Sequence, residues 1–166
     1  MSVYTFRGMT TDDFALVHRW LTTPEVDRWW GDPDQDKGDD DELPFEEALG
    51  DPNIALWIVS HGGRPFAYIQ DYDPHAWANH HFASLPLGSR GIDQFIGEPD
   101  MLGCGHGSAF IRAHVERLFA QGAPAVGTDP HPSNARAIRA YEKAGFVRDV
   151  EQDTEWGRAL LMVRLR

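Results

Sequence analysis

The stretch TDPHPSNARAIRAYEKAGF, residues 128–146, sets the local order of elements on which the predicted fold depends. The apolar run APAVGTD leads into it and predicts a short strand that ends near Thr128. Two prolines then interrupt regular structure, and Ser133 is a suitable N-cap for the helical pattern that follows. Gly145 stands just past the last helical position, where a left-handed backbone is common. The stretch therefore predicts a strand, a tight turn and a helix.

A second strand and helix precede this stretch. RGIDQFIG, residues 90–97, alternates and is apolar enough for a buried strand. SAFIRAHVERLFAQG, residues 108–122, places its apolar side chains on one face of a helix that ends at Gly122. Because strand–helix–strand connections within one sheet are right-handed crossovers, the two strands are predicted to pair in parallel.

The rest of the chain predicts antiparallel strands and short helices. Further strands are predicted over residues 3–9, 54–60 and 64–73, and two more over residues 146–166, around a turn near Trp156-Gly157. Further helices are predicted after Thr10, from Pro24, and from Pro44 to Leu49. The predicted fold is therefore α/β: a mixed, mostly antiparallel sheet with helices on both faces. Residues 1–166 hold no repeat or linker, so a single domain is expected.

The composition limits the classes of partner. The chain has 166 residues and a formal net charge of -11, with 26 acidic and 15 basic residues. This charge argues against nucleic acid or an anionic membrane surface as a partner. It permits a cationic small-molecule substrate, although an acidic surface also serves solubility alone. Cys104 is the single cysteine, and the sequence has no leader peptide or long apolar run, so a cytoplasmic domain is expected. The expected oligomeric state is a monomer or a weak homodimer.

Glycines cluster in Gly103-Cys104-Gly105-His106-Gly107, between a predicted strand and a predicted helix. A dinucleotide-binding motif needs a third glycine where Ser108 stands, and a nucleoside-triphosphate loop needs a Lys that is missing. A cradle for the pyrophosphate of coenzyme A needs only alternating glycines at a helix start, where N–H groups and the helix dipole favour an anion. A glycine turn without a ligand is the remaining interpretation.

The opening stretch places polar side chains near this cluster. Its strand and the strand over residues 90–97 should end at the same edge, where ligands bind in open α/β sheets. Asn134, just inside the predicted helix, and Tyr141, seven residues later, share a helix face. They could hold a pantetheine arm and protonate a leaving thiolate, or they could be a turn residue and a core tyrosine.

Two segments together resemble a known family. LGCGHGSAFIRAHVERLF paired with TDPHPSNARAIRAYEKAGF resembles the acetyl-coenzyme A site of the GNAT N-acetyltransferases, mainly across residues 88–147. More narrowly, RGIDQ, TDP-x-PSN-x-RAIR and YEKAGF resemble the aminoglycoside 6'-N-acetyltransferases, and PEVDRWWG resembles their Trp-Trp segment. The resemblance implies the GNAT fold and acetyl transfer from acetyl-coenzyme A to a primary amine of a cationic small molecule, an aminoglycoside 6'-amine, without a metal.

The same resemblance assigns roles to matching positions. Binding of coenzyme A would fall to Gly103, Gly105, His106, Gly107, Ser108 and Asn134. Tyr141 would also contact the cofactor and act as general acid toward the departing thiolate. Asp93 and Asp129 would face the cationic acceptor, with Trp30 lining its cleft. Trp156 is a further candidate for substrate binding, although it does not match the family at its position.

The implied reaction needs few chemical groups. A free ammonium has a pKa of about 10 and must lose a proton before it attacks. A carboxylate such as Asp93, directly or through water, can take that proton. A backbone N–H beside the cofactor would stabilise the thioester oxyanion, and Tyr141 would supply a proton to the thiolate.

Some positions depart from the aminoglycoside enzymes and keep alternatives open. The loop over residues 73–89 holds one Trp and three His, where that family is rich in Trp and Glu. Leu102 stands where many GNAT proteins have Arg or Gln, and Trp156 where the aminoglycoside enzymes often have an acid. IDQFIGEPDMLG also resembles enzymes that acetylate hydroxylamine side chains in siderophore synthesis. A hydroxylamine acceptor and a non-catalytic acyl-coenzyme A-binding module are therefore the alternatives.

An Asp-rich segment and a group of histidines could each suggest a metal site. Asp32, Asp34 and Asp36 have calcium-loop spacing, but the glycine and bidentate Glu of such a loop are out of register. A solvated or substrate-facing acidic loop is the preferred interpretation. The histidines of residues 73–89, His75, His80 and His81, lack the cysteines and spacing of a zinc site. No metal is predicted.

Overall fold

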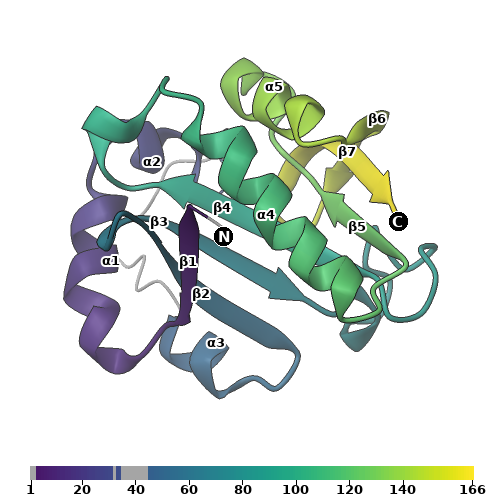
Figure 1. Cartoon of the computed structure of the whole chain (residues 1–166). Helices are drawn as coiled ribbons and strands as arrows, with labels where there is room; N and C mark the ends of the chain where they lie inside the picture. Colours follow the sequence, from purple (N-terminus) through teal and green to yellow (C-terminus); the bar gives the residue numbers. More distant parts are fainter. Residues whose placement is uncertain (1–2, 32, 35–44) are drawn as a thin grey trace.

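The computed structural model describes residues 3–31, 33–34 and 45–166, whose arrangement is shown in Figure 1. Seven strands form one sheet in the order β1-β2-β3-β4-β5-β7-β6. The strands are β1 (Tyr4–Gly8), β2 (Ile54–His61), β3 (Arg64–Tyr72), β4 (Arg90–Ile96), β5 (Ala125–Thr128), β6 (Val147–Thr154) and β7 (Gly157–Leu165). The helices are α1 (Phe14–Leu21), α2 (Pro24–Trp29), α3 (Phe45–Gly50), α4 (His106–Ala120) and α5 (Ala135–Lys143). Short 3-10 turns lie at η1 (Thr11–Asp13), η2 (Pro74–Ala76) and η3 (Pro99–Met101).

The sheet is mixed and mostly antiparallel, as predicted. In the described chain β4 and β5 pair in parallel, and the other neighbouring strands pair antiparallel. The β4–β5 ladder is short and contains Arg90 opposite Val126 and Gly91 opposite Gly127. Because β4 continues to Ile96, most of its edge on that side is not covered by β5. The two strands therefore separate in the middle of the sheet.

Helices cover both faces of the sheet, which confirms the predicted layers. On one face Val59 and Ile69 pack against α4 and α5. On the other face Ile58 and Tyr68 pack against α1, α2 and α3. Successive strand side chains point to opposite faces, so neighbouring residues of β2 and β3 contribute to different cores. Figure 1 shows α4 lying across the near face of the sheet.

Two predicted helix starts need correction. Helix α4 begins at His106, two residues before the predicted start, because its N-cap Gly105 adopts a left-handed φ of +82°. Helix α5 is capped by Asn134 and not by Ser133, because Asn134 Oδ1 accepts a hydrogen bond of 3.2 Å from the N–H of Ala137. Asn134 is therefore the N-cap of α5 and not a residue inside it.

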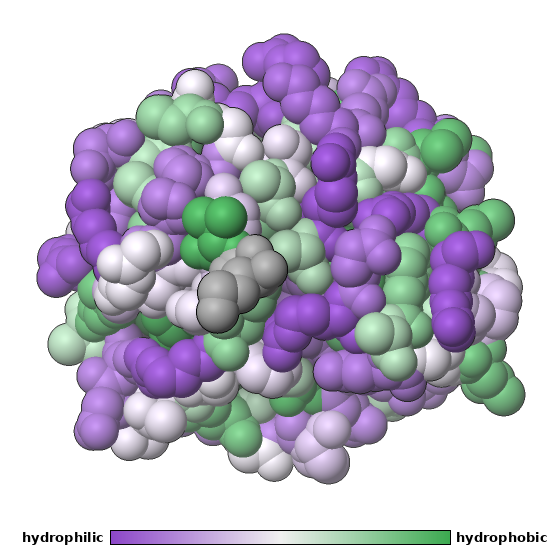
Figure 2. Space-filling view, in the orientation of Figure 1, coloured by the Kyte–Doolittle hydropathy of each residue, from purple (hydrophilic) through white to green (hydrophobic). Residues whose placement is uncertain are grey.

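The face drawn in Figure 2 is mainly hydrophilic, in keeping with the 25% of charged residues. Among the large apolar side chains, Trp156 is 53% exposed at the β6–β7 turn. Within the described ranges, none of the helices is both long and apolar enough to cross a membrane.

Candidate active site

A cleft of about 1140 Å³ opens where β4 and β5 separate. It is lined by residues predicted for the donor, Gly103, Gly105, Gly107, Ser108, Asn134 and Tyr141. It is also lined by the residues predicted for the acceptor, Trp30, Asp93, Asp129 and Trp156. The structure thus brings together every predicted site residue except His106. We call the part around the glycines the donor end and the part around Asp93 and Asp129 the acceptor end.

The donor end is formed by the turn that enters α4. Gly103 and Gly105 have φ angles of +70° and +82°, which are accessible to glycine without strain. Among the described residues, no side chain caps the N-terminus of α4, where the first N–H groups of a helix have no partner within the helix. Exposed N–H groups at the positive end of a helix dipole suit an anionic group such as a pyrophosphate. The residues present at this end therefore fit the pyrophosphate of coenzyme A.

The side chain of His106 lies outside the cleft. Its Nδ1 is 2.9 Å from the hydroxyl of Tyr4, and its ring centroid is 4.7 Å from that of His61 and 5.5 Å from that of Phe66. These neighbours lie on β1, β2 and β3, away from the glycine turn. Any contribution of His106 to the donor end is therefore left to its backbone.

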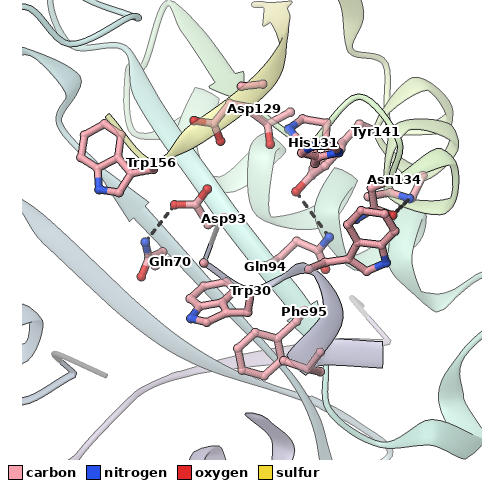
Figure 3. Close-up of a pocket in the computed structure, with 18 of the residues that line it drawn as sticks. Trp30, Gln70, Asp93, Gln94, Phe95, Asp129, His131, Asn134, Tyr141 and Trp156 are labelled. Atoms are coloured by element: carbon pink, nitrogen blue, oxygen red, sulfur yellow. Dashed lines mark hydrogen bonds between the residues drawn. The ribbon is translucent and has the colours of Figure 1, made fainter. Parts of the chain in front are cut away.

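Tyr141 extends from α5 toward β4. Its side chain is 4% exposed, and Gln94 Nε2 donates to its hydroxyl at 3.4 Å (Figure 3). Burial raises the pKa of Tyr141, and the nearby carboxyls of Asp93 and Asp129 raise it further. The phenol is therefore protonated at neutral pH and has a proton to give.

A row of basic residues on α5 was not identified from the sequence. Arg136, Arg139 and Lys143 line the same cleft as the glycine turn. Their spacing of three and four residues places them on one helix face, so the periodicity contained a signal for them. They give the donor end positive charge for an anionic ligand.

Asp93 is held at the acceptor end by its neighbour across the sheet. Gln70 on β3 stands opposite Asp93 on β4, and Gln70 Nε2 donates to Asp93 Oδ2 at 2.9 Å (Figure 3). Burial raises the pKa of Asp93 well above its usual range, and the neighbouring Asp129 carboxyl raises it further. The hydrogen bond from Gln70 opposes this rise. Asp93 is therefore a stronger proton acceptor than an ordinary surface carboxylate.

Asp129 follows β5 and meets the loop of residues 73–89. His81 Nε2 lies 2.7 Å from Asp129 Oδ2, and the His81 side chain is 5% exposed. The ring of His80 stacks on His81 with centroids 4.1 Å apart. Burial, followed by the neighbouring His81, lowers the pKa of His80 to about 4, so His80 is neutral at neutral pH.

The packing of this loop explains why His81 reaches Asp129. Phe82 is 2% exposed and lies over Gly127 of β5, where an added Cβ would come within 2.8 Å of the ring. Glycine at position 127 therefore allows the loop to lie directly on the strand that ends beside Asp129. Sequence reasoning assigned these residues to a loop without a partner, and no local pattern signalled the contact.

Aromatic side chains line the acceptor end. The Trp30 ring meets Phe95 and Tyr68 edge to face, with centroids 5.0 and 5.8 Å apart. The Trp156 ring lies 5.4 Å from that of His80, and Figure 3 shows Trp156 close to Asp93 and Asp129. An exposed aromatic ring beside two carboxylates suits a cationic ligand with apolar ring surfaces.

Residues whose spacing suggests a metal site have other contacts in the structure. Asp34 Oδ2 lies 2.9 Å from His131 Nε2, whereas Asp32 and Asp36 are outside the described residues. His75 Nε2 contacts the carbonyl oxygens of Ala83 and Leu85, away from His80 and His81. Across the described part of the chain, no group of three or more His, Cys, Asp or Glu is arranged to hold a metal ion.

His114 lies on α4 and is not among the residues that line the cleft. It is 1% exposed, and its Nε2 lies 3.0 Å from Asp71 Oδ2. Trp57 and Arg90 also donate to the Asp71 carboxylate. His114 is thus a core histidine whose two ring nitrogens both have partners, Asp71 and Arg117.

Comparison with known proteins identifies the class that this fold and cleft define. The family model of the acetyltransferase (GNAT) domain matches residues 10–154, and the chain belongs to the GNAT acetyltransferases. It is an acetyl-coenzyme A-dependent N-acetyltransferase with the GNAT fold, as predicted.

The similar relatives are more specific. Aminoglycoside N(6')-acetyltransferase type 1 of Klebsiella pneumoniae is 36% identical over 169 residues, which cover 98% of this chain and 83% of the relative. The kanamycin resistance protein of Rhizobium radiobacter is 49% identical over 80 residues, 48% of this chain and 74% of the relative. The solved structure of AAC(6')-Ib with parmomycin and acetyl-coenzyme A is 36% identical and superposes with a TM-score of 0.85, covering 98% of this chain and 93% of that chain.

Proposed function

We propose that this enzyme acetylates the 6'-amine of an aminoglycoside by direct attack of the amine on acetyl-coenzyme A in a ternary complex. The observation that carries the proposal is the single cleft, which joins a glycine turn at a helix N-terminus to a pair of carboxylates. The glycine turn suits an anionic cofactor, and the pair of carboxylates suits a cationic acceptor. The similarity to aminoglycoside 6'-acetyltransferases over nearly the whole chain supports this acceptor class.

At the donor end, the residues act on the cofactor. The backbone N–H groups of residues 103–108 bind the pyrophosphate, and Arg136, Arg139 and Lys143 add positive charge. Asn134 uses its Oδ1 to cap α5, which leaves its amide N–H groups for the pantetheine arm. The uncovered edge of β4 supplies backbone N–H groups for the arm and for the thioester oxygen.

At the acceptor end, the residues act on the amine. Asp93 and Asp129 bind the ammonium, and Trp30 and Trp156 flank the sugar rings. Asp93 takes one proton, so an N–H bond breaks and the nitrogen lone pair becomes free to attack the thioester carbon. The new C–N bond forms as the C–S bond breaks, and Tyr141 gives its proton to the departing thiolate. The acetylated nitrogen then loses its second proton, which restores the Tyr141 hydroxyl and leaves a neutral amide.

One copy of the chain supplies both ends of the cleft. The described lining comes from α2 through the β6–β7 turn of a single chain. We propose a single-domain enzyme that is a monomer or a weak homodimer and in which each copy is a complete catalytic unit. Gel filtration of the active enzyme tests this, and activity confined to a dimer fraction would contradict it.

An acceptor screen with thiol detection tests the proposed acceptor. Acetyl-coenzyme A is supplied with kanamycin and other aminoglycosides, with polyamines, and with hydroxylamines such as N-hydroxylysine. We expect thiol release to be fastest with aminoglycosides, and NMR of the product to place the acetyl group on the 6'-amine. Faster release with a hydroxylamine would overturn the aminoglycoside assignment, and cofactor binding without turnover on any amine would overturn catalysis.

A further inference from the structure

Each carboxyl at the acceptor end has one oxygen in contact with a nitrogen of a neighbouring side chain. Gln70 Nε2 donates to Asp93 Oδ2 at 2.9 Å, and His81 Nε2 lies 2.7 Å from Asp129 Oδ2. We infer that Gln70 and His81 are positioning residues, which direct the second oxygens of the two carboxyls to one shared ammonium group of the acceptor. The inference rests on the proposed function, because it concerns the amine that is acetylated.

The two carboxyls already interact with each other. Asp129 contributes to Asp93 both a charge interaction and a side-chain hydrogen bond. In Figure 3 both groups lie beside Trp156, with Gln70 on the far side of Asp93. Because Oδ2 of each carboxyl meets its own donor, Oδ1 is the oxygen left for the partner carboxyl or for a cation between them.

Gln70 is itself fixed in orientation. The hydroxyl of Tyr68 donates to Gln70 Oε1 at 2.7 Å, and Tyr68 is fully buried. Burial raises the pKa of Tyr68 well above 10, so this phenol remains a donor at any working pH. With its carbonyl oxygen engaged, the amide presents its NH₂ group to Asp93 and stabilises the carboxylate form.

His81 is fixed by packing. Its ring lies between His80 and Phe82, with centroid distances of 4.1 and 4.6 Å. Phe82 packs on Gly127, which lies two residues before Asp129. The end of β5 therefore positions both the loop that carries His81 and the Asp129 carboxyl. The nitrogen that faces the Asp129 carboxylate must carry its proton, so His81 acts as a donor there.

None of the described residues that shift the pKa of Asp93 is a cation. Asp129 faces it from the end of β5, and the phenols of Tyr68, Tyr72 and Tyr141 face it from β3 and α5. An ammonium between the two carboxyls therefore relieves their repulsion. When the amine gives up its proton, an N–H bond breaks and an O–H bond forms at Asp93 Oδ1, because Gln70 occupies Oδ2.

The first test needs no acceptor. Carbon-13 NMR follows the Asp93 carboxyl during a pH titration of the free enzyme. We expect Gln70→Leu to raise the titration midpoint by about one pH unit, because a hydrogen bond to the charged form is lost. Asp129→Asn should lower it. Gln121→Leu, at the exposed C-terminal cap of α4, is the matched control and should leave it unchanged.

A second substitution at Gln70 keeps this test decisive if one variant does not fold. Gln70→Leu removes the donor, and Gln70→Glu keeps an acceptor for Tyr68 while placing an acid opposite Asp93, so both should raise the midpoint. Thermal unfolding establishes that each variant is folded. An unchanged midpoint in a folded Gln70→Leu protein would overturn the role of Gln70, whatever the acceptor proves to be.

The second test uses kinetics with kanamycin as the acceptor. His81→Leu should raise KM for kanamycin about 10-fold, and His81→Gln, whose Nε2 can replace the imidazole donor, should recover most of the loss. In Gln70→Leu, the apparent pKa of the acid limb of the kcat/KM pH profile should be higher than in the wild type. Equal losses in His81→Leu and His81→Gln would overturn the donor role, since a purely structural His81 would not distinguish them.

The two tests distinguish a failure of the proposed acceptor from a failure of the proposed positioning residues. A wild-type enzyme that acetylates no aminoglycoside sinks the proposed acceptor, while the carboxyl titration still decides the role of Gln70. His18→Leu, on the exposed side of α1, is the control for replacing a histidine and should leave KM unchanged.

Discussion

The donor and acceptor ends of the cleft are built in different ways. The donor end comes from the turn into α4 and from α5, two segments that are each continuous in sequence. The acceptor end draws single residues from separate elements, including Trp30 after α2, Gln70 on β3, Asp93 on β4 and Trp156 at the β6–β7 turn. In the proposed function the donor end binds its ligand mainly through backbone N–H groups, whereas the acceptor end binds through side chains. Acceptor choice can therefore change by substitution without disturbing the way the cofactor is held.

The two ends also differ in charge. Arg136, Arg139 and Lys143 line the donor end, although the whole chain carries a net charge of -11. Asp93 and Asp129 form the acceptor end, where burial and mutual repulsion already raise the pKa of Asp93. A cleft with separated charges directs an anionic cofactor and a cationic acceptor to opposite ends.

The largest expected effect is at the acceptor end. Asp93→Asn should lower kcat/KM for kanamycin by about 10²–10⁴-fold, because the proton acceptor is lost. Binding of coenzyme A, measured by calorimetry, should stay within a few-fold of wild type. A variant that keeps more than half of its activity would contradict the assignment of Asp93 as the base.

The same substitution should stabilise the free protein. The pKa of Asp93 is raised in the folded state, so stability is lost as pH rises from its unfolded value through the folded one. Asp93→Asn should therefore unfold at a higher temperature than wild type at pH 7 and at nearly the same temperature below about pH 4. Calorimetric melting at the two pH values checks this, and an equal gain at both would disprove the electrostatic cause.

A smaller effect is expected at the junction of the two ends. Tyr141→Phe should reduce kcat by about 10- to 100-fold, because the thiolate leaves without its proton donor. Since burial raises the pKa of Tyr141, the loss should be constant between about pH 6 and 9. A loss that grows with pH in this range would mean that the phenol ionises and that another group acts as the acid.

A backbone change should affect the donor end alone. Gly105→Ala should weaken coenzyme A binding about 10-fold, because φ of +82° is strained for alanine and the N–H groups shift. No atom of the described residues lies within 4 Å of the added Cβ, so the expected loss comes from backbone strain. Gly62→Ala, with φ of +56° and the same open surroundings in the β2–β3 turn, carries similar strain and should bind coenzyme A normally.

The smallest effect on binding is expected at His106. His106→Ala should change the affinity for coenzyme A by less than about 2-fold, because its side chain contacts Tyr4, His61 and Phe66 and not the cleft. The melting temperature should fall instead. A large loss of affinity at unchanged stability would mean that the imidazole does reach the cofactor.

Much of the fold could be predicted from sequence. The hairpin at Gly62-Gly63, the helix ends at Gly122 and Gly145, and the parallel pairing of β4 with β5 depend on periodicity and turn chemistry. The N-cap of α5 was displaced by one residue, because Ser133 and Asn134 are both good caps and only the backbone path decides between them. The start of α4 moved because a left-handed glycine can itself be the N-cap.

The sequence by itself predicted the glycine turn, the helix that follows it and the shared helix face of Asn134 and Tyr141, because these are local features that depend on near neighbours. It also named Asp93 and Asp129, through short motifs that surround them. Only the tertiary structure decided what holds those carboxylates. Gln70 meets Asp93 through the β3–β4 register, and His81 meets Asp129 across 48 residues of chain. Such contacts depend on strand register and loop packing. Both are determined by the packing of the whole core and cannot be predicted from the spacing of residues along a short segment.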